Sequence, residues 1–344
     1  MHIQENVLLS EKTTMRLGGP ADFFISIESA DDVRDAFDFA NDKNLPVYFL
    51  GTGANTIGLD SGFPGVILHN QIMGLKVLTE DKDTLTIQVG GGVAWDDFVA
   101  WTVEKGFSGA ELLSYIPGSV AAAPVQNIGA YGAEAAEIIT SVSAYDTLLD
   151  EYVEIPVKDC DFSYRHSIFN SGETKGRYFI LSVTFRLTKT QKTPPFYNSL
   201  QTYLNEHDIS DYSPKHLRAA VIAIRKAKLP DPAKEPSAGS FFKNIYVSAA
   251  ESERLKALGI SSRPDRDGQS KVNTARVLEL AGVKGKLFHG FEVSDKAPLV
   301  LINRSATSSE ELAAAVADIK QIVQEKFNLT LEQEPELIQE PLHG

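Results

Sequence analysis

Cysteine is almost absent, because Cys160 is the only one in 344 residues. A single cysteine excludes an intramolecular disulfide and any zinc site built from several thiolates. The seven histidines form no cluster with acidic residues at metal-ligand spacing, so we predict no bound metal. Long hydrophobic runs are also missing: the most apolar stretches, such as YFILSVTF, are too short to cross a bilayer. The N-terminus lacks the basic and apolar regions of a signal peptide, and we expect a cytoplasmic protein without membrane partners.

Positive charge is scarce as well. The chain has 33 lysines and arginines against 46 aspartates and glutamates, which gives a formal net charge of −13. Nucleic acids and anionic membranes attract basic surfaces, so neither is an expected partner. An anionic small molecule would need a locally basic pocket. The rest of the composition is typical of a soluble globular protein, and the length predicts two or three domains. We expect a monomer.

Hydrophobic periodicity predicts a small βαβ-like unit at the start of the chain. Asp22–Ser29 is a predicted strand, residues 31–44 a helix, and Pro64–Asn70 a further strand after the buried segment LPVYFLG. A β-rich section follows, with a hairpin predicted over residues 75–92.

The clearest domain boundary follows an amphipathic helix predicted over Ser213–Pro232, which two prolines end. Beyond it the sequence predicts further helices. One of them begins near Ser248 with Glu251 three residues later, which is a capping-box arrangement. The closing segment LTLEQEPEL, residues 329–337, is a predicted strand.

Two glycine-rich stretches are suited to a phosphate and to a flat ligand. GTGAN, Gly51–Asn55, follows a buried strand, and its backbone N–H groups could cradle phosphate oxygens. An ordinary tight turn explains this stretch equally well. The second stretch, IPGSVAAAPVQNIGAYGAE over Ile116–Glu134, combines many small residues with Gln126 and Asn127 as hydrogen-bonding side chains. It favours a backbone packed closely on a large flat group, the alternative being a helix start with small-residue packing.

The segment AGSFFKN places Ser240 between a glycine and two phenylalanines. It lacks the GxSxG pattern of a nucleophile elbow, and no histidine lies nearby in the sequence to act as a base. A serine of this kind is a poor nucleophile, but it can donate a proton to a carbanion formed beside it. The alternative is a structural hydroxyl that caps a turn.

Two further motifs carry charge. Arg165 in FSYRHSIF lies among aromatic and small polar residues, where a guanidinium can bind a carboxylate through two parallel hydrogen bonds. A surface ion pair is the alternative. Glu332, Glu334 and Glu336 would share one face of the closing strand by its two-residue period. The alternative for them is an edge strand with a solvated acidic face.

The motifs IPGSVAAAPVQNIGAYG, YRHSIF, KLPDP, AGSFFKN and LEQE stand in the order and spacing of one enzyme family. The chain resembles the UDP-N-acetylenolpyruvoylglucosamine reductases over nearly its whole length. The resemblance implies an α+β protein with an FAD-binding fold of the vanillyl-alcohol-oxidase type in two subdomains, and a smaller α+β substrate-binding domain. The corresponding bounds are residues 1–75, 76–228 and 229–327, with residues 328–344 returning to the first subdomain.

The resemblance also implies a reaction in peptidoglycan synthesis. NADPH reduces a tightly but non-covalently bound FAD and leaves, and UDP-N-acetyl-3-O-(1-carboxyvinyl)-glucosamine then enters the same pocket. N5 of the flavin delivers a hydride to C3 of the enolpyruvyl group, Ser240 protonates C2, and UDP-N-acetylmuramate results. Arg165 matches the residue that binds the substrate carboxylate and stabilises the enolate, and Glu334 matches the acidic partner near C2. Two alternatives are another FAD-dependent oxidase or dehydrogenase of the same fold and a non-enzymatic flavin- or UDP-sugar-binding module.

The binding residues follow from the same matches. The implied FAD contacts are Gly51, Thr52, Gly53, Ala54, Asn55, Thr56, Ile116, Pro117, Gly118, Ser119, Ala122, Ala123, Gln126, Asn127, Gly129, Ala130, Tyr131 and Arg225. The last of these matches a basic residue near the flavin. The implied substrate contacts are Tyr164, Tyr197, Lys228 and Asn244, and the segment TPPFYNSLQTYL around Tyr197 resembles the insertion of the longer family subtype. One departure is Pro335-Glu336, which stands where family members commonly carry Val-Arg. Neither the residues nor the resemblance assigns a role to Lys243.

Overall fold

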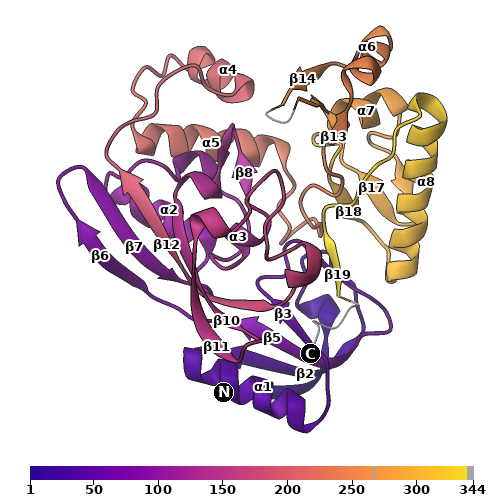
Figure 1. The fold of residues 1–344 in the computed structure, drawn as a ribbon. Helices are drawn as coiled ribbons and strands as arrows, with labels where there is room; N and C mark the ends of the chain where they lie inside the picture. Colours follow the sequence, from indigo (N-terminus) through magenta and orange to yellow (C-terminus); the bar gives the residue numbers. More distant parts are fainter. Residues whose placement is uncertain (266–267, 339–344) are drawn as a thin grey trace.

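The computed structural model describes residues 1–265 and 268–338. Figure 1 shows three units: an N-terminal sheet at the bottom, a second sheet with helices at the left and a C-terminal unit at the right. The first sheet has the order β1-β2-β5-β3, with β2, β5 and β3 parallel, and β1 antiparallel to β2. Its elements, with one strand outside this sheet, are β1 (His2–Leu8), β2 (Pro20–Ile27), α1 (Ala30–Asp42), β3 (Val47–Leu50), β4 (Thr56–Gly58) and β5 (Phe63–Asn70).

Helix α1 covers the first sheet because its apolar residues repeat at helical spacing. Val33, Ala36 and Ala40 are buried on one side, and Ser29 caps the helix in a reciprocal pair with Asp32. The same core cluster includes residues of the second unit, among them Tyr145 and Phe179, so the two sheets share one packed layer of side chains. The strands and helix predicted for this region are confirmed.

The second unit is an antiparallel sheet of order β11-β10-β12-β7-β6. Trp95, Phe98 and Phe185 pack ring against ring at its centre, which holds α2 on the sheet. The elements are β6 (Leu75–Glu80), β7 (Thr84–Gly90), α2 (Trp95–Glu104), α3 (Ala122–Val125), β8 (Gly129–Ala130), β9 (Ala133–Glu134), β10 (Ile139–Asp146), β11 (Glu151–Pro156), β12 (Tyr178–Thr188), α4 (Asn198–Glu206) and α5 (Pro214–Lys228).

The C-terminal unit builds its core around helices α7 and α8 and short strands. Met15, Leu17 and Ile57 from the start of the chain are buried in this same core. Its elements are β13 (Ile245–Val247), α6 (Ala249–Ala257), β14 (Ser262–Pro264), β15 (Ser270–Val272), α7 (Thr274–Ala281), β16 (Leu287–Phe288), β17 (Phe291–Val293), β18 (Leu301–Asn303), α8 (Ser309–Phe327) and β19 (Glu336–Ile338).

The strand predicted over residues 329–337 is mostly wrong. Only β19, Glu336–Ile338, is a strand, and it pairs in parallel with β4 (Figure 1). Leu329 and Leu331 pack in the C-terminal core, and Pro335, which has no N–H to donate, interrupts any longer ladder. The return of the chain to the first unit holds for residues 336–338, whereas residues 339–344 lie outside the described part.

The capping box predicted at Ser248 is half correct. The Ser248 hydroxyl accepts a hydrogen bond from the Glu251 backbone N–H, but the Glu251 carboxylate accepts from Arg254. The Arg254 guanidinium, one helix turn further on, binds the Glu251 carboxylate, which therefore does not accept the Ser248 backbone N–H that would complete the box. Among the helices of the described residues, none combines the length and the apolar character needed to cross a membrane.

Candidate active site

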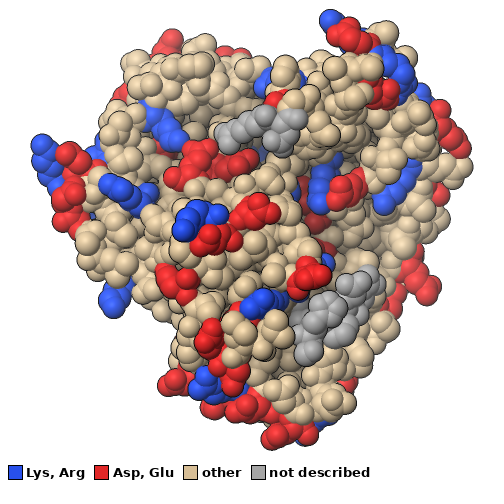
Figure 2. All heavy atoms as spheres, in the orientation of Figure 1, with Lys and Arg blue, Asp and Glu red and all other residues tan. Residues whose placement is uncertain are grey.

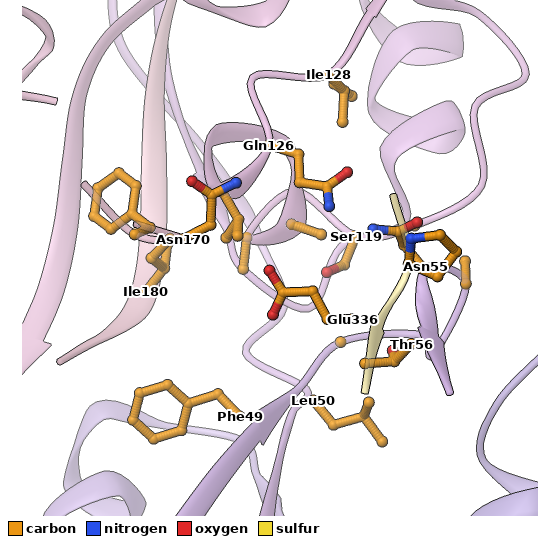
Figure 3. A pocket seen from close by; sticks show the side chains of 18 of the residues that line it. Phe49, Leu50, Asn55, Thr56, Ser119, Gln126, Ile128, Asn170, Ile180 and Glu336 are labelled. Atoms are coloured by element: carbon orange, nitrogen blue, oxygen red, sulfur yellow. The ribbon is translucent and has the colours of Figure 1, made fainter. Parts of the chain in front are cut away.

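A cavity of about 710 Å³ lies between the first two units and is bordered by the C-terminal segment. Figure 3 looks into it and shows Ser119, Asn55 and Thr56 on one side, Phe49 and Leu50 below, and the Glu336 carboxylate in the middle. Its wall includes eleven of the eighteen predicted FAD-binding residues: Gly51, Thr52, Gly53, Ala54, Asn55, Thr56, Pro117, Gly118, Ser119, Ala122 and Gln126. The structure therefore brings the two glycine-rich stretches together around one space.

The turn after β3 presents unpaired backbone donors to this cavity. Within the part of the chain that the structure describes, none of the four N–H groups of residues 51–54 donates a hydrogen bond to another residue. Gly53 has φ +67°, and a Cβ there would lie 2.0 Å from the Lys12 carbonyl oxygen, so only glycine fits. Consecutive free N–H groups in such a turn bind anionic oxygens.

Ser119 adds a further donor without a hydrogen-bond partner, next to this turn. Its hydroxyl is buried and has no hydrogen-bond partner among the described residues. A Cβ on Gly51 would lie 3.1 Å from this hydroxyl oxygen, which places Ser119 directly against the turn. Burying a hydroxyl without a partner costs about 1–3 kcal/mol, so its position at the cavity wall indicates a polar ligand.

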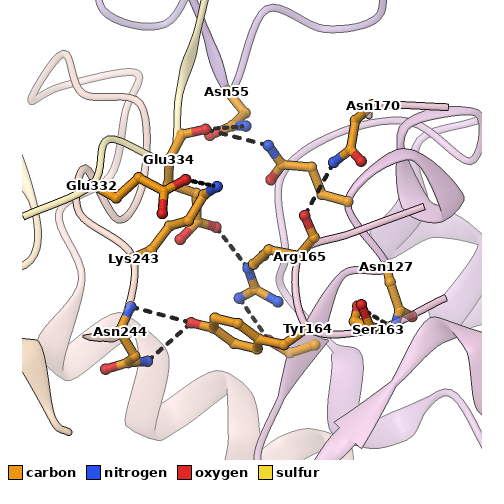
Figure 4. Close-up of polar contacts among 12 residues, drawn as sticks. Asn55, Asn127, Ser163, Tyr164, Arg165, Asn170, Lys243, Asn244, Glu332 and Glu334 are labelled. Atoms are coloured by element: carbon orange, nitrogen blue, oxygen red, sulfur yellow. Dashed lines mark hydrogen bonds and ion pairs between the residues drawn. The ribbon is translucent and has the colours of Figure 1, made fainter. Parts of the chain in front are cut away.

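The three predicted catalytic residues lie on segments that meet at one end of the cavity, where Arg165 and Glu334 line the wall and Ser240 does not. Ser240 lies next to Phe241, whose carbonyl oxygen accepts a 2.8 Å hydrogen bond from the Glu334 N–H. Phe242 and Gln333 form an antiparallel bridge, which sets the serine loop beside the glutamate segment. Arg165 reaches them from the second unit, and its Nε donates to Glu334 Oε1 over 2.7 Å (Figure 4).

Arg165 is held in a strained turn. Its φ is +57°, and Ser163 and His166 close the turn with two backbone hydrogen bonds of 3.2 Å. Its Nη2 donates to the Gly129 carbonyl oxygen over 3.3 Å, whereas Nη1 donates to no described residue. Burial is the largest single effect on the pKa of Arg165 and lowers it, but the charges of Glu334 and Tyr164 and the hydrogen bond to Glu334 together outweigh burial, and the pKa is raised. The Arg165 guanidinium therefore stays positively charged, and its Nη1 group is available to a ligand.

Each of the three acidic residues near the C-terminus pairs with a cation. Glu334 pairs with Arg165, Glu332 with Lys243 over 2.5 Å, and Glu336 with Lys175 over 3.8 Å. The Glu332 side chain is 72% exposed, whereas those of Glu334 and Glu336 are 10% and 28% exposed, so the three carboxylates do not form one solvated acidic face. Lys243, to which the sequence assigns no role, pairs with Glu332 and so links the serine loop to the glutamate segment.

A second polar cluster adjoins the catalytic end. The Tyr164 hydroxyl accepts hydrogen bonds from the backbone and side-chain nitrogens of Asn244, at 3.4 and 3.0 Å. The Lys271 ammonium lies 3.5 Å from the centre of the Tyr164 ring and 5.6 Å from that of Tyr246. Burial and then the charge of Arg165 lower the pKa of Lys271. The sequence offered no local signal for Lys271, because it faces this cluster only through the pairing of β15 with β13.

Other predicted contacts lie outside the cavity wall. The Asn127 side chain donates to Glu134 and to the Ser163 carbonyl oxygen, so its amide holds the loop together. Arg225 donates to the Tyr115 carbonyl oxygen, and burial lowers its pKa. The predicted residues that do not line this cavity are Ile116, Ala123, Asn127, Gly129, Ala130, Tyr131, Tyr164, Tyr197, Arg225, Lys228, Ser240 and Asn244. Their contacts with cofactor or substrate stay predictions.

Tyr197 and Lys228 are the most peripheral of these. Tyr197 is 47% exposed, with its ring 6.1 Å from that of Tyr131, and Lys228 is exposed at the end of α5. The cavity also has lining residues that sequence reasoning missed, namely Tyr48, Asn70, His166, Asn170, Lys175 and Tyr178 among others, and Glu336 of the Pro335-Glu336 departure lines it too. Within the described residues, no three His, Cys, Asp or Glu side chains are grouped so that they could hold a metal ion.

The surface around the site is mixed in charge. Figure 2 shows acidic and basic side chains interspersed on one face of the described part, without a continuous basic patch there. Such a face gives no support to nucleic-acid binding. The basic groups that matter for a small anion lie at the cavity instead, on Arg165, Lys175 and Lys243.

Comparison with known proteins agrees with this geometry. Residues 21–149 match an FAD binding domain, and residues 231–338 match the C-terminal domain of UDP-N-acetylenolpyruvoylglucosamine reductase. The reductase of Pseudomonas putida is 35% identical over 97% of this chain and 98% of its own length, and that of Salinispora arenicola is 37% identical over 98% and 96%. The crystal structure of the reductase from Thermus caldophilus superposes with a TM-score of 0.64 at 23% identity, covering 98% of this chain and 99% of that one.

The predicted fold class is confirmed by these matches: the chain is an α+β protein with an FAD-binding domain and a reductase-type C-terminal domain. The bounds proposed between its domains are not tested by them. Sequence identity of this size along nearly the whole of both chains shows that the chain belongs to the UDP-N-acetylenolpyruvoylglucosamine reductase family of oxidoreductases.

Proposed function

We propose that this chain binds FAD in the cavity and uses NADPH to reduce the enolpyruvyl group of UDP-N-acetyl-3-O-(1-carboxyvinyl)-glucosamine to UDP-N-acetylmuramate. The residues around the cavity supply groups that suit FAD. The unpaired N–H groups of residues 51–54 and the orphaned Ser119 hydroxyl form a cradle suited to the FAD diphosphate. The small residues Gly118 and Ala122 leave room for a flat ring system along the wall.

When bound, FAD supplies the hydride, which it receives from NADPH. The protein has to bind the substrate carboxylate and to stabilise the negative charge that develops on it. Arg165 suits this task because its Nη1 is free while Nε and Nη2 are fixed by Glu334 and Gly129. A cation held in place before the reaction stabilises an enolate without reorganisation.

Ser240 would donate the proton to C2. Its hydroxyl makes no hydrogen bond with another described residue, although its backbone is fixed by a bridge to Val300 and by the neighbouring Phe241. This combination of a fixed backbone and a free hydroxyl, in a loop whose next residue, Phe241, is hydrogen-bonded to Glu334 of the Arg165–Glu334 pair, is the observation that carries the proposal. Tyr164, Asn244 and Lys271 would bind the more distant parts of the UDP-sugar, whose diphosphate needs donors and a cation.

The test uses the FAD-loaded protein under anaerobic conditions. NADPH bleaches the flavin, and the enolpyruvyl substrate is then added while the return of flavin absorbance is followed. Ser240→Ala should keep the bleaching step and lose about 10²–10⁴ in the rate of product formation. Ser305→Ala, which removes an exposed hydroxyl away from the cavity, is the matched control and should behave as the wild type.

The outcomes separate the alternatives. Product formation by Ser240→Ala at a rate close to the wild-type rate would overturn the proton-donor role. A wild-type protein whose reduced flavin is reoxidised by oxygen but never by the enolpyruvyl sugar would favour an oxidase of the same fold. A protein that binds flavin but is not bleached by NADPH would refute the proposed electron donor.

A further inference from the structure

The Glu336 carboxylate places a negative charge inside the cavity, where it would repel a bound diphosphate. Its side chain projects to the centre of the cavity in Figure 3. In the structure its backbone N–H donates to the Asn55 carbonyl oxygen over 2.9 Å, and Glu336 is paired with Thr56 in the β4–β19 ladder. Paired strands lie about 4.8 Å apart, so the Glu336 backbone lies beside Asn55 and Thr56, the two residues that directly follow the turn at residues 51–54.

Among the described residues, Lys175 forms an ion pair with this carboxylate. Its Nζ lies 3.8 Å from Glu336 Oε2, and the two side chains are 47% and 28% exposed. Lys175 comes from the loop before β12, and it lines the same cavity as the turn at residues 51–54. The pair therefore joins two cavity-lining segments that are far apart in the sequence.

The other cations of the cavity wall already pair with other acidic residues. Arg165 is bound to Glu334 at the catalytic end, and Lys243 to Glu332. His166 pairs with Asp161 when it is protonated. Among the described residues that line the cavity, this leaves Lys175 as the remaining cation in the space that the diphosphate cradle also lines.

We infer that Lys175 binds the FAD diphosphate and that Glu336 holds the Lys175 ammonium over the cavity for this purpose. This inference rests on the FAD binding that the proposed function assumes. The ammonium, 3.8 Å from Glu336, can contact a phosphate oxygen on its other side, since a lysine has three donors on one nitrogen. The backbone N–H groups of residues 51–54 and Ser119 then bind the diphosphate from one side and Lys175 from the other.

The inference predicts a specific order of affinities. Lys175→Gln removes the cation and leaves Glu336 facing the diphosphate, so FAD should bind about 10- to 100-fold more weakly. Glu336→Gln in addition removes the remaining repulsion, so the double variant should bind FAD about 3- to 10-fold more tightly than Lys175→Gln alone. A merely structural loss at this loop would instead become larger when a second side chain is changed.

The experiment measures FAD release from the full-length, FAD-loaded protein on dilution, by the rise in flavin fluorescence, at 0.05 M and 0.5 M NaCl. Wild-type affinity should fall as salt rises, and Lys175→Gln should show a smaller fall, because its cation–diphosphate contact is gone. Lys158→Gln removes the same charge from an exposed position outside the cavity. At each of the two salt concentrations, this variant should bind FAD with the wild-type affinity.

The inference is overturned if Lys175→Gln releases FAD as the wild type does, if its salt dependence is unchanged, or if the double variant binds FAD no better than Lys175→Gln. A wild-type protein that does not retain FAD at all would refute the proposed function itself. The two failures are therefore distinguishable.

Discussion

Gly53 and Gly239 form a natural pair for testing how the phosphate cradle is built. Both have a left-handed backbone, with φ +67° and +69°. A Cβ added at Gly239 would meet no atom within 4 Å, whereas one added at Gly53 would lie 2.0 Å from the Lys12 carbonyl oxygen and 2.9 Å from Thr13 Cα. Alanine at each position shares the same conformational strain, and only alanine at 53 adds a collision with backbone.

The structure gives the size of each effect. Left-handed geometry costs a residue with a Cβ about 1–2 kcal/mol, and part of this is offset because alanine restricts the unfolded chain. Gly239→Ala should therefore lower the free energy of unfolding by about 1 kcal/mol. At Gly53 the clash with Lys12 forces the backbone apart, and such overpacking costs about 1–3 kcal/mol more. The Gly53 carbonyl oxygen would also be displaced from Thr14, whose N–H donates to it over 3.1 Å.

Urea unfolding of the flavin-free proteins measures this difference without the stabilisation that bound FAD would add. Gly53→Ala should unfold at a clearly lower urea concentration than Gly239→Ala, and should also bind FAD more weakly, because the donors of residues 51–54 move. Equal destabilisation of the two variants would show that the close approach to Lys12 does not constrain the turn, and the reasoning would fail.

Two further predictions concern groups away from the cavity. Burial acts to raise the pKa of Asp96, but two hydrogen bonds from Arg218 and one from the Tyr115 N–H lower it. The stabilisation from this carboxylate is therefore complete above the ordinary carboxyl pKa and is lost as the pH falls through the lowered value. Asp96→Asn should cost about 2 kcal/mol at pH 7 and flatten the acid side of the stability profile, as followed by urea unfolding; an unchanged acid side would contradict this. Burial raises the pKa of the Cys160 thiol to about 12, so iodoacetamide should modify it only after unfolding, and rapid labelling of the native protein would contradict its burial.

Much of the fold could be predicted because its signals are local. The helices around Val33 and Leu217 show apolar residues at helical spacing, and the structure buries those faces. The assignment of Met15, Leu17 and Ile57 to the core of the C-terminal unit could not be predicted, because no local pattern says which distant surface an apolar residue will meet. For the same reason the closing segment was taken for a strand, although its residues before Pro335 pack against other elements.

The site divides in the same way. Gly53 was predictable because a backbone with positive φ and a close neighbour requires glycine, and Ser240 and Arg165 were found through short motifs. Lys271 and Lys175 could not be predicted, because strand pairing brings Lys271 to its cluster and the loop before β12 brings Lys175 to the cavity wall. A lysine in an unremarkable sequence context carries no signal until its neighbours in space are known.

The cavity joins residues from both ends of the described chain, and this has a consequence for biosynthesis. The Asn55 amide donates to the Glu334 carbonyl oxygen over 3.5 Å, and these partners are 279 positions apart. Ribosomes add about 5–20 residues per second, so the turn that would cradle the diphosphate exists for tens of seconds before its opposite wall has been made. A nascent chain therefore cannot capture the flavin in its final pocket, and loading of the cofactor is a late event that follows synthesis of the segment around Glu334.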